Sequence, residues 1–244
     1  MTIKDITFDL WQTLILDSPE GLQKAKEARI QGLQEILIQH GIGVGLAEME
    51  QAYEESGRKL QEIWKKSIDV SIREQVGIFL GCLDHHHLPS FPPEVMAVLM
   101  KAYASPILGA MPTLNEGAIE TLEGLKGKDY QIGLISNTGR TPGYMLRIVL
   151  KRFGLLDYFD VLTFSDEVRI RKPDSRIFHL TLEKMGAISR CSIHIGDDLR
   201  ADVGGAKGAG MQAIHLRRDE APPGDSEADG TIGRLQELLG LLSL

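Results

Sequence analysis

The feature that most constrains the fold of this chain is the alternation of short apolar runs with helix-length segments after residue 106. Runs of strand length lie at 132–135, 161–164, 192–195 and 212–216, and residues 3–8 supply one more. Segments of helical length separate them at 116–127, 142–153, 174–186 and 200–209. This alternation predicts an α/β fold, in which helices cover both faces of a parallel sheet.

Residues 17–104 carry a different pattern, which is helical almost throughout. A first helix begins at Ser18-Pro19, a capping residue followed by a first-turn proline, and ends at Gly41. The residues expected on its apolar face are Leu22, Ala25, Arg29, Leu33, Ile36 and Leu37. Three more helices are expected at about 46–66, at 70–83 and from Pro92-Pro93 to Tyr103. We therefore expect a helical domain at 17–104, inserted into a sheet domain formed by 1–16 and 105–244.

The charge balance excludes two classes of partner. The 244 residues hold 27 Lys and Arg against 34 Asp and Glu, a net charge of -7, which has the wrong sign for nucleic acid or anionic lipid. No apolar run approaches the about 20 residues of a membrane span, and Lys4, Asp5 and Asp9 interrupt the N-terminal run. We expect a cytoplasmic protein with a small-molecule substrate, in which Cys82 and Cys191 are free thiols.

Polar side chains follow four of the expected strands. Asp9 and Thr13 follow the first, Ser136-Asn137 the second, Arg171-Lys172 the third, and Gly196-Asp197-Asp198 the fourth, with Asp202 close behind. Each of these alone is also explained by turn chemistry or helix capping. Because ligands bind beyond the carboxyl ends of parallel strands, their order along the chain predicts one shared cleft.

These residue types together suit phosphoryl transfer. Asp9 is the expected nucleophile, and Lys172 would offset the negative charge of nucleophile and substrate. Thr13 and Ser136 would donate hydrogen bonds to phosphoryl oxygens. Asp197, with Asp202 or Asp198, would complete an oxygen-rich site suited to Mg²⁺.

The same residues resemble the motifs of the haloacid dehalogenase (HAD) superfamily of hydrolases, most of which are phosphatases. The resemblance covers essentially the whole chain, and its four motifs are Asp9-Leu10-Trp11-Gln12-Thr13-Leu14, Ser136-Asn137, Lys172-Pro173 and Gly196-Asp197-Asp198 to Asp202. It implies a Rossmann-like core, an inserted α-helical cap and an aspartyl-phosphate intermediate. It also implies Mg²⁺ held by Asp9, Asp197 and the Trp11 carbonyl. We expect catalytic roles for Asp9, Thr13, Ser136 and Lys172, substrate binding by Asn137, and Asp202 as a further metal ligand, with Asp198 as the alternative.

One position departs from the family pattern. Phosphatases of this superfamily usually carry a second aspartate two residues after the nucleophile, which protonates the leaving oxygen, and here that position is Trp11. An indole cannot act as a general acid, so we expect a Mg²⁺-dependent phosphatase of small phosphorylated metabolites with weakened acid catalysis.

Two alternatives remain open. In having an aromatic residue at the position of Trp11, the chain is similar to the superfamily's 2-haloacid dehalogenases. In those enzymes the leaving group is a halide, which needs no proton. Those enzymes work without metal and carry a tyrosine six residues after the lysine, where this chain has Phe178. A regulatory protein that kept the Mg²⁺ site but lost efficient turnover is the second alternative.

Three other signals carry less weight. His85-His86-His87 is expected in a loop, and residues 219–229 form an acidic, proline-containing segment expected to be a solvated loop. His194 and His215 lie in apolar strands and are expected to be packed, hydrogen-bonded residues.

Overall fold

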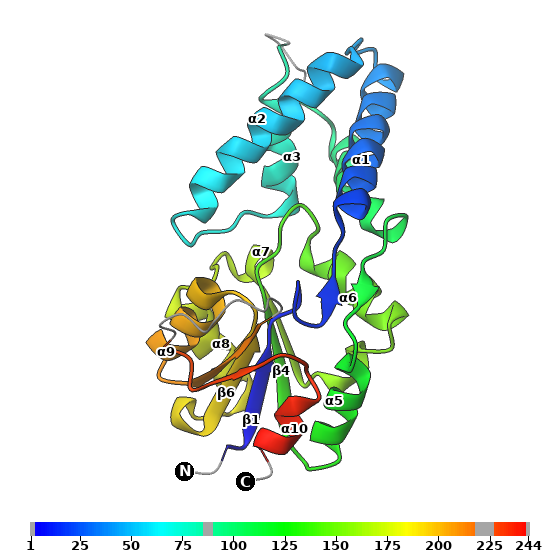
Figure 1. Ribbon diagram of the computed structural model, residues 1–244. Helices are drawn as coiled ribbons and strands as arrows, with labels where there is room; N and C mark the ends of the chain where they lie inside the picture. The colour runs from blue at the N-terminus through cyan, green and yellow to red at the C-terminus, as the bar shows by residue number, and fades with distance from the viewer. Residues whose placement is uncertain (1–2, 85–89, 218–226, 243–244) are drawn as a thin grey trace.

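The computed structural model describes residues 3–84, 90–217 and 227–242, and its centre is a six-stranded sheet (Figure 1). The strand order is β5-β4-β1-β6-β7-β8, and every adjacent pair is parallel. The strands are β1 (Asp5–Phe8), β4 (Gln131–Ser136), β5 (Val161–Phe164), β6 (Ser192–Gly196), β7 (Gln212–Leu216) and β8 (Gly230–Ile232). The predicted α/β fold with a parallel sheet is confirmed.

Helices cover both faces of the sheet. Those of the sheet layer are α5 (Ala118–Lys126), α6 (Gly143–Arg152), α7 (Ser165–Val168), α8 (Ser175–Met185), the π-helical turn η4 (Leu199–Gly204), α9 (Gly205–Gly208) and α10 (Glu237–Leu241). Neighbouring residues of β4 divide between two apolar clusters, because side chains alternate across a strand: Leu134 packs with α5 and α6, and Ile135 with α8 and α9. The described part of the chain also contains 3₁₀ turns at η1 (Ser105–Leu108), η2 (Leu156–Tyr158) and η3 (Ser189–Cys191).

The order of the strands places a crevice beside β1. The chain adds β4 and then β5 on one side of β1, and it adds β6, β7 and β8 on the other. The direction of winding therefore reverses between β1 and β6. In open parallel sheets, ligands bind at the carboxyl ends of the strands at such a reversal, so Asp9 and Asp197 follow the two strands that matter most.

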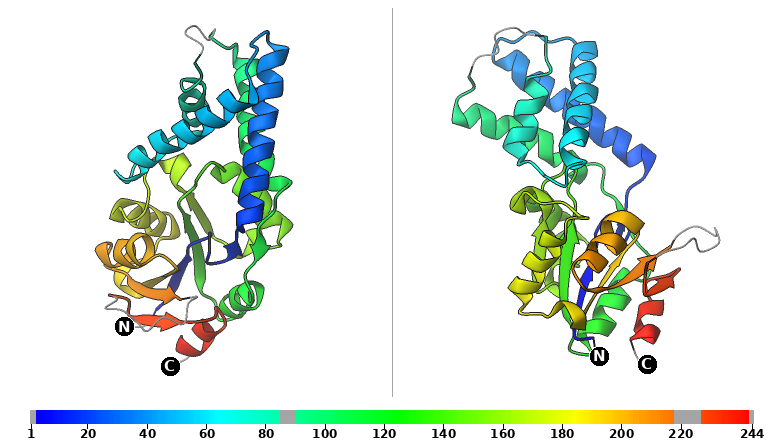
Figure 2. Two further views of the ribbon diagram at one scale, coloured as in Figure 1. Left: turned by 45° about the horizontal axis from the view of Figure 1, so that its top comes forward. Right: turned by 90° about the vertical axis from the view of Figure 1, so that its left-hand side faces the viewer.

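Four helices form a separate layer above the carboxyl ends of the strands, and all three views show it on the same side (Figures 1 and 2). They are α1 (Pro19–Gln39), α2 (Leu46–Trp64), α3 (Ile72–Leu80) and α4 (Pro93–Ala104). The chain enters this layer through β2 (Ile15–Leu16) and leaves it through β3 (Thr113–Leu114), which pair antiparallel. The four expected helices are present, while the proposed division into two domains stays a prediction.

Several details differ from the sequence-based expectation. The β2–β3 pair and β8 were not predicted, because two- and three-residue strands carry no readable periodicity. Leu22 was expected on the apolar face of α1 but is 55% exposed, since it lies in the first turn. The prediction of buried packing at Leu22 is therefore wrong. The predicted end of this helix is confirmed, because Gly41, with φ of +79°, follows α1.

Other expectations can be placed as follows. The residues of the histidine run, 85–87, lie outside the described residues, as does most of the acidic segment 219–229. Cys82 and Cys191 are free, half-buried thiols, as predicted. None of the helices in the described ranges is long and apolar enough to cross a membrane.

A buried carboxylate, Asp69, joins the helical layer to the sheet layer. It lies between α2 and α3, is 1% exposed, and its loop pairs with the loop after α7 through Ile68 and Ile170. Its acceptor atoms receive hydrogen bonds from Trp64 Nε1 (2.9 Å), Val70 N (2.8 Å), Thr138 Oγ1 (3.2 Å), Arg171 Nη1 (2.7 Å) and Ser165 Oγ. Donors from both layers therefore meet at one carboxylate.

We expect Asp69→Asn to lower the free energy of unfolding by about 3–5 kcal/mol, because it leaves the Arg171 guanidinium without its charge partner in a buried site. Denaturant titration followed by circular dichroism measures the change. Asp157→Asn, which makes the same chemical change at an exposed position, is the control. Equal small losses in both variants would contradict the importance of the Asp69 junction.

Candidate active site

Asp9 lies at the carboxyl end of the central strand. Its backbone N–H donates to Ile195 O at 2.9 Å, which continues the β1–β6 pairing by one residue and fixes the direction of the side chain. The side chain is 6% exposed. Asp9 is therefore a buried carboxylate held at the crevice that the strand order creates.

The Lys172 ammonium is the group that holds the site together. Its Nζ donates to Asp9 Oδ1 at 2.5 Å, to Asp202 Oδ1 at 2.6 Å and to Ile135 O at 2.8 Å. Asn137 fixes the backbone of Lys172, since its Oδ1 accepts from Lys172 N at 2.8 Å and its Nδ2 donates to Lys172 O at 3.0 Å. The structure thus brings together three of the residues predicted after separate strands, together with Asp202.

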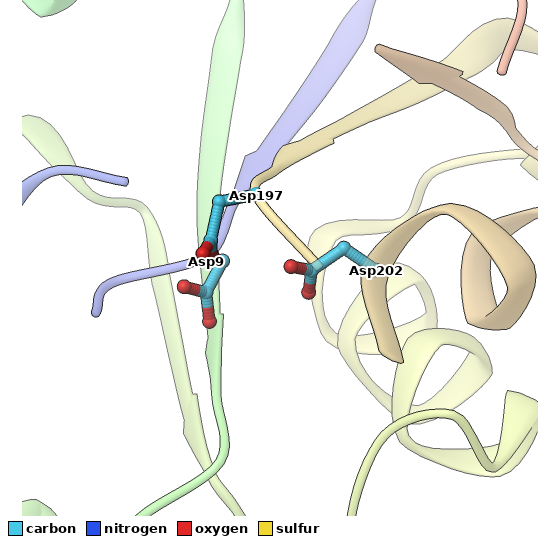
Figure 3. A group of neighbouring side chains, drawn as sticks. All are labelled: Asp9, Asp197 and Asp202. Atoms are coloured by element: carbon cyan, nitrogen blue, oxygen red, sulfur yellow. The ribbon is translucent and has the colours of Figure 1, made fainter. Parts of the chain in front are cut away.

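Three carboxylates converge beside Lys172, and Figure 3 shows them facing one another. One oxygen of each of Asp9, Asp197 and Asp202 lies within 4.8 Å of the others. Gly196 permits this approach, because a Cβ at that position would lie 2.3 Å from the carboxyl group of Asp202. Oxygen donors at this spacing fit a hard divalent cation such as Mg²⁺. Asp198 is exposed, and it caps η4 through the N–H groups of Arg200 and Ala201.

The carboxylates of Asp9 and Asp202 share Lys172 but differ in their pKa. Burial raises the pKa of Asp9 to about 7, repulsion from Asp202 acts in the same direction, and Lys172 opposes both. Burial also acts to raise the pKa of Asp202, but Lys172 and His194 hold it below its ordinary value. His194 contributes to the difference in pKa, because its side chain contacts Asp202 and acts on that carboxylate but not on Asp9.

His194, in β6, contacts the carboxylate of Asp202. Its Nε2 lies 3.3 Å from Asp202 Oδ1, and its Nδ1 lies 2.8 Å from Thr7 Oγ1. The ring of Phe178 packs edge-on against the imidazole, with centroids 5.1 Å apart. His194 is buried and hydrogen-bonded as predicted, but its contact with Asp202 was not foreseen. His215 is half-buried, and its Nε2 lies 3.0 Å from Asp197 O.

The hydroxyls of Thr13 and Ser136 are both fully buried, and neither has a hydrogen-bond partner in the described part of the chain. A buried hydroxyl without a partner costs free energy, so its persistence calls for an explanation such as a ligand. Thr13 belongs to the tight turn after β1, in which Gln12 N donates to Ile15 O at 2.7 Å. Both hydroxyls suit the predicted role of donating to phosphoryl oxygens.

A cavity of about 780 Å³ separates the helical layer from the sheet layer. Its lining includes Trp11 and Asn137 from the sheet layer, and Arg29, Tyr53 and Trp64 from the helical layer. A smaller cavity of about 320 Å³ borders Lys172 and Asp198 and shares Asn137 and Trp64 with the first. Trp11 is half-buried, so its indole is available as a wall of the larger cavity.

Sequence comparison with protein families agrees with this arrangement: the model of the haloacid dehalogenase-like hydrolases matches residues 3–210. The chain belongs to the haloacid dehalogenase-like hydrolases. Membership of this family makes the protein a hydrolase, an enzyme class that the motifs had indicated. The roles of the individual site residues stay predictions.

The relatives and solved structures that resemble this chain include both phosphatases and a dehalogenase. A ribulose-1,5-bisphosphate 5-phosphatase from Halopiger xanaduensis is 31% identical over 174 residues, which cover 68% of this chain and 71% of that protein. The structure of a HAD phosphatase from Thermococcus onnurineus matches with a TM-score of 0.64 and 27% identity over 98% of both chains. A 2-haloacid dehalogenase from Pseudomonas syringae pv. Tomato has the same fold, with a TM-score of 0.72 and 24% identity over 99% of both chains.

We expect Lys172→Met to lower the free energy of unfolding by about 3–5 kcal/mol, because Asp9 and Asp202 would remain buried without their shared cation. Lys207→Met is the matched control, since Lys207 pairs with Asp229 at the surface, where an ion pair contributes only about 0–1 kcal/mol. Denaturant titration compares the two variants. A loss no larger than that of the control would show that the ammonium is not needed for the fold.

Proposed function

We propose that this hydrolase is a Mg²⁺-dependent phosphatase of small phosphorylated metabolites. The observation that carries the proposal is the buried Asp9 carboxylate, held by Lys172 beside two further carboxylates and two unpartnered hydroxyls. The phosphatase relative that covers 68% of this chain supports the same reaction class. In this proposal residues 17–104 act as a cap over the site, with residues 1–16 and 105–244 as the catalytic core.

In the proposed reaction, a carboxylate oxygen of Asp9 attacks the phosphorus of the substrate. The bond between phosphorus and the leaving oxygen breaks, and the phosphoryl group is carried as an aspartyl-phosphate. Lys172 offsets the charge of the attacking carboxylate, while Thr13 and Ser136 donate hydrogen bonds to phosphoryl oxygens and Asn137 contacts the substrate. Water then attacks the phosphorus of the aspartyl-phosphate, which releases phosphate and restores Asp9.

A divalent cation completes this site in the proposal. Asp9, Asp197 and Asp202 would hold it, together with the main-chain carbonyl of Trp11, and their spacing fits that role. When bound, Mg²⁺ would neutralise charge that develops on the phosphoryl oxygens. Lys172 alone cannot balance three carboxylates and an incoming phosphate, so the donor set itself favours a cation.

The dehalogenase alternative fits the structure less well. In that reaction Asp9 would attack carbon and expel a halide, a step in which three clustered carboxylates serve no purpose. Phe178, at the position of the dehalogenase tyrosine, packs against His194. The likeness to the Pseudomonas dehalogenase concerns the fold alone. Halide release from 2-haloacids without Mg²⁺ would establish this alternative, and Mg²⁺ binding without any turnover would establish a regulatory protein.

We expect Asp9→Asn to abolish phosphate release, because an amide cannot form the acyl-phosphate bond. Phosphate release from a panel of phosphate esters with Mg²⁺ measures the effect, and removal of Mg²⁺ with a chelator should stop the wild-type reaction. Asp157→Asn, at an exposed position, should leave the rate unchanged. Full turnover in a folded Asp9→Asn variant would refute the role of Asp9.

The indole of Trp11 leads to an expectation about leaving groups. Without a general acid at this position, alkyl phosphates should react more slowly than aryl or acyl phosphates, whose leaving oxygens depart as stable anions. Trp11→Asp should raise the rate for alkyl phosphates. The upper limit of the increase is about 10²- to 10⁴-fold, which is what general acid–base catalysis contributes. The ratio of kcat/KM for alkyl and aryl substrates measures this effect.

Trp11→Asn is the matched control, because it removes the ring to the same extent without adding an ionisable group. Thermal unfolding of both variants measures the cost of losing the half-buried ring. Equal alkyl and aryl rates in the wild type, with chemistry rate-limiting, would show that another group supplies the proton.

A further inference from the structure

Two guanidinium groups in the larger cavity contact no carboxylate directly in the part of the chain that the structure describes. Arg29 projects from α1 and is 4% exposed, and half-buried Arg140 comes from the loop between β4 and α6. Within residues 3–84, 90–217 and 227–242, neither forms an ion pair with a carboxylate. The other two cations of the lining differ, because Lys26 pairs with Glu54 and Arg171 pairs with Asp69.

Neutral groups hold these two guanidiniums in place. Arg29 Nε donates to Tyr103 O at 2.6 Å, and Arg29 Nη1 donates to Tyr53 OH at 3.2 Å. Arg140 donates to Tyr53 O at 2.7 Å, to Tyr103 OH at 2.5 Å and to Ser56 Oγ at 3.2 Å. The Arg140 guanidinium also lies 3.8 Å from the centroid of the Tyr53 ring, and that of Arg29 lies 5.2 Å from the Tyr103 ring.

These contacts orient the two cations without placing a carboxylate of the described residues in direct contact with either, and Glu54, which pairs with Lys26 in the same cavity, acts on Arg140 only through space. A charge removed from water without an opposite charge is costly, and neutral acceptors or aromatic faces offset only part of that cost. Burial lowers the pKa of the Arg29 guanidinium, and repulsion from Arg140 acts in the same direction, while both tyrosines oppose it. An anion that accepts hydrogen bonds from both residues would supply the missing charge.

The cavity connects this pair to the candidate active site. Asn137, which lines the same cavity, is hydrogen-bonded to the backbone of Lys172. Trp11, two residues after Asp9, lines it as well. A substrate whose phosphoryl group reaches Asp9 would therefore extend along these walls toward α1 and α2.

We propose that Arg29 and Arg140 bind a second anionic group of the substrate, a phosphate or a carboxylate, at the end remote from Asp9. This inference rests on the proposed phosphatase function and narrows it to doubly anionic substrates. A purely structural role, in which Arg140 ties the sheet layer to α2 and α4, is the competing explanation. The two differ in whether the arginines discriminate between one and two anionic groups.

The test is equilibrium binding of phosphonates, because their carbon–phosphorus bonds are not hydrolysed by a phosphatase. Alkanediphosphonates of increasing chain length are compared by calorimetry with alkylphosphonates of the same length, on the wild-type protein with Mg²⁺. At the length that spans the cavity, the diphosphonate should bind at least about tenfold more tightly. Phosphonocarboxylates of that length show whether the subsite prefers carboxylate or phosphate.

Arg29→Met and Arg140→Met should each remove the advantage of the second anion while leaving alkylphosphonate binding unchanged. Arg29→Lys should restore part of it, and Arg58→Met, the same change at an exposed position on α2, should keep it intact. If Arg29→Met fails to fold by circular dichroism, the half-buried Arg140 still decides the question.

Diphosphonates that bind no more tightly at any length, or variants that weaken both ligand classes equally, would overturn the proposal. Its failure is distinguishable from failure of the phosphatase assignment. Normal phosphate release without a diphosphonate advantage would refute the second anion site alone. A retained advantage in a protein that releases no phosphate would refute the phosphatase and leave the anion site standing.

Discussion

The ammonium of Lys172 is the group on which the arrangement of the site depends. Its three donors reach the end of β1 at Asp9, the backbone of β4 at Ile135 and the carboxylate of Asp202 in η4. Because every N–H of the ammonium is used, it has one position, and that position fixes both carboxylates. Three carboxylates then face one ammonium, and burial lowers the pKa of the neighbouring His194 imidazole. The negative charge left over is what makes the site suitable for a divalent cation.

The larger cavity carries positive charge away from the carboxylates of Asp9, Asp197 and Asp202. Arg29 and Arg140 face it from α1 and from the loop after β4, and among the described residues their direct contacts are with aromatic rings and neutral oxygens rather than with carboxylates. A ligand with an anionic group at each end would therefore be oriented by two different sets of residues. A cation among the carboxylates would attract the reacting phosphoryl group, and the guanidiniums would attract the distal group. The same charge pattern would disfavour a substrate with an apolar or cationic tail.

The position of the candidate site was predictable from the sequence because it follows from strand topology. Asp9 and Asp197 directly follow strands, Ser136 is the last residue of β4, and Lys172 lies in the crossover after β5. Parallel strands bring their carboxyl ends to one edge of the sheet. Two kinds of contact were not predictable because no local sequence pattern encodes them. One is the junction at Asp69, which joins loops distant in sequence, and the other is the contact of His194 in β6 with Asp202 in η4. Arg29 did carry a signal, because a charged residue on the apolar face of a helix needs a reason to be there.

Trp11 lies two residues after Asp9 and lines the same cavity as Arg29 and Arg140. A carboxylate at this position would add a further negative charge beside Asp9, Asp197 and Asp202, which Lys172 alone already fails to balance. The indole avoids that repulsion and gives the cavity an apolar wall, but it supplies no proton to a leaving oxygen. In the proposed phosphatase reaction, the substrate would therefore have to provide a leaving oxygen that needs no proton. In the proposed reaction, a substrate that is held by two anionic groups and whose leaving oxygen departs as a stable anion would need positioning and the Asp9 nucleophile from the protein, but no general acid.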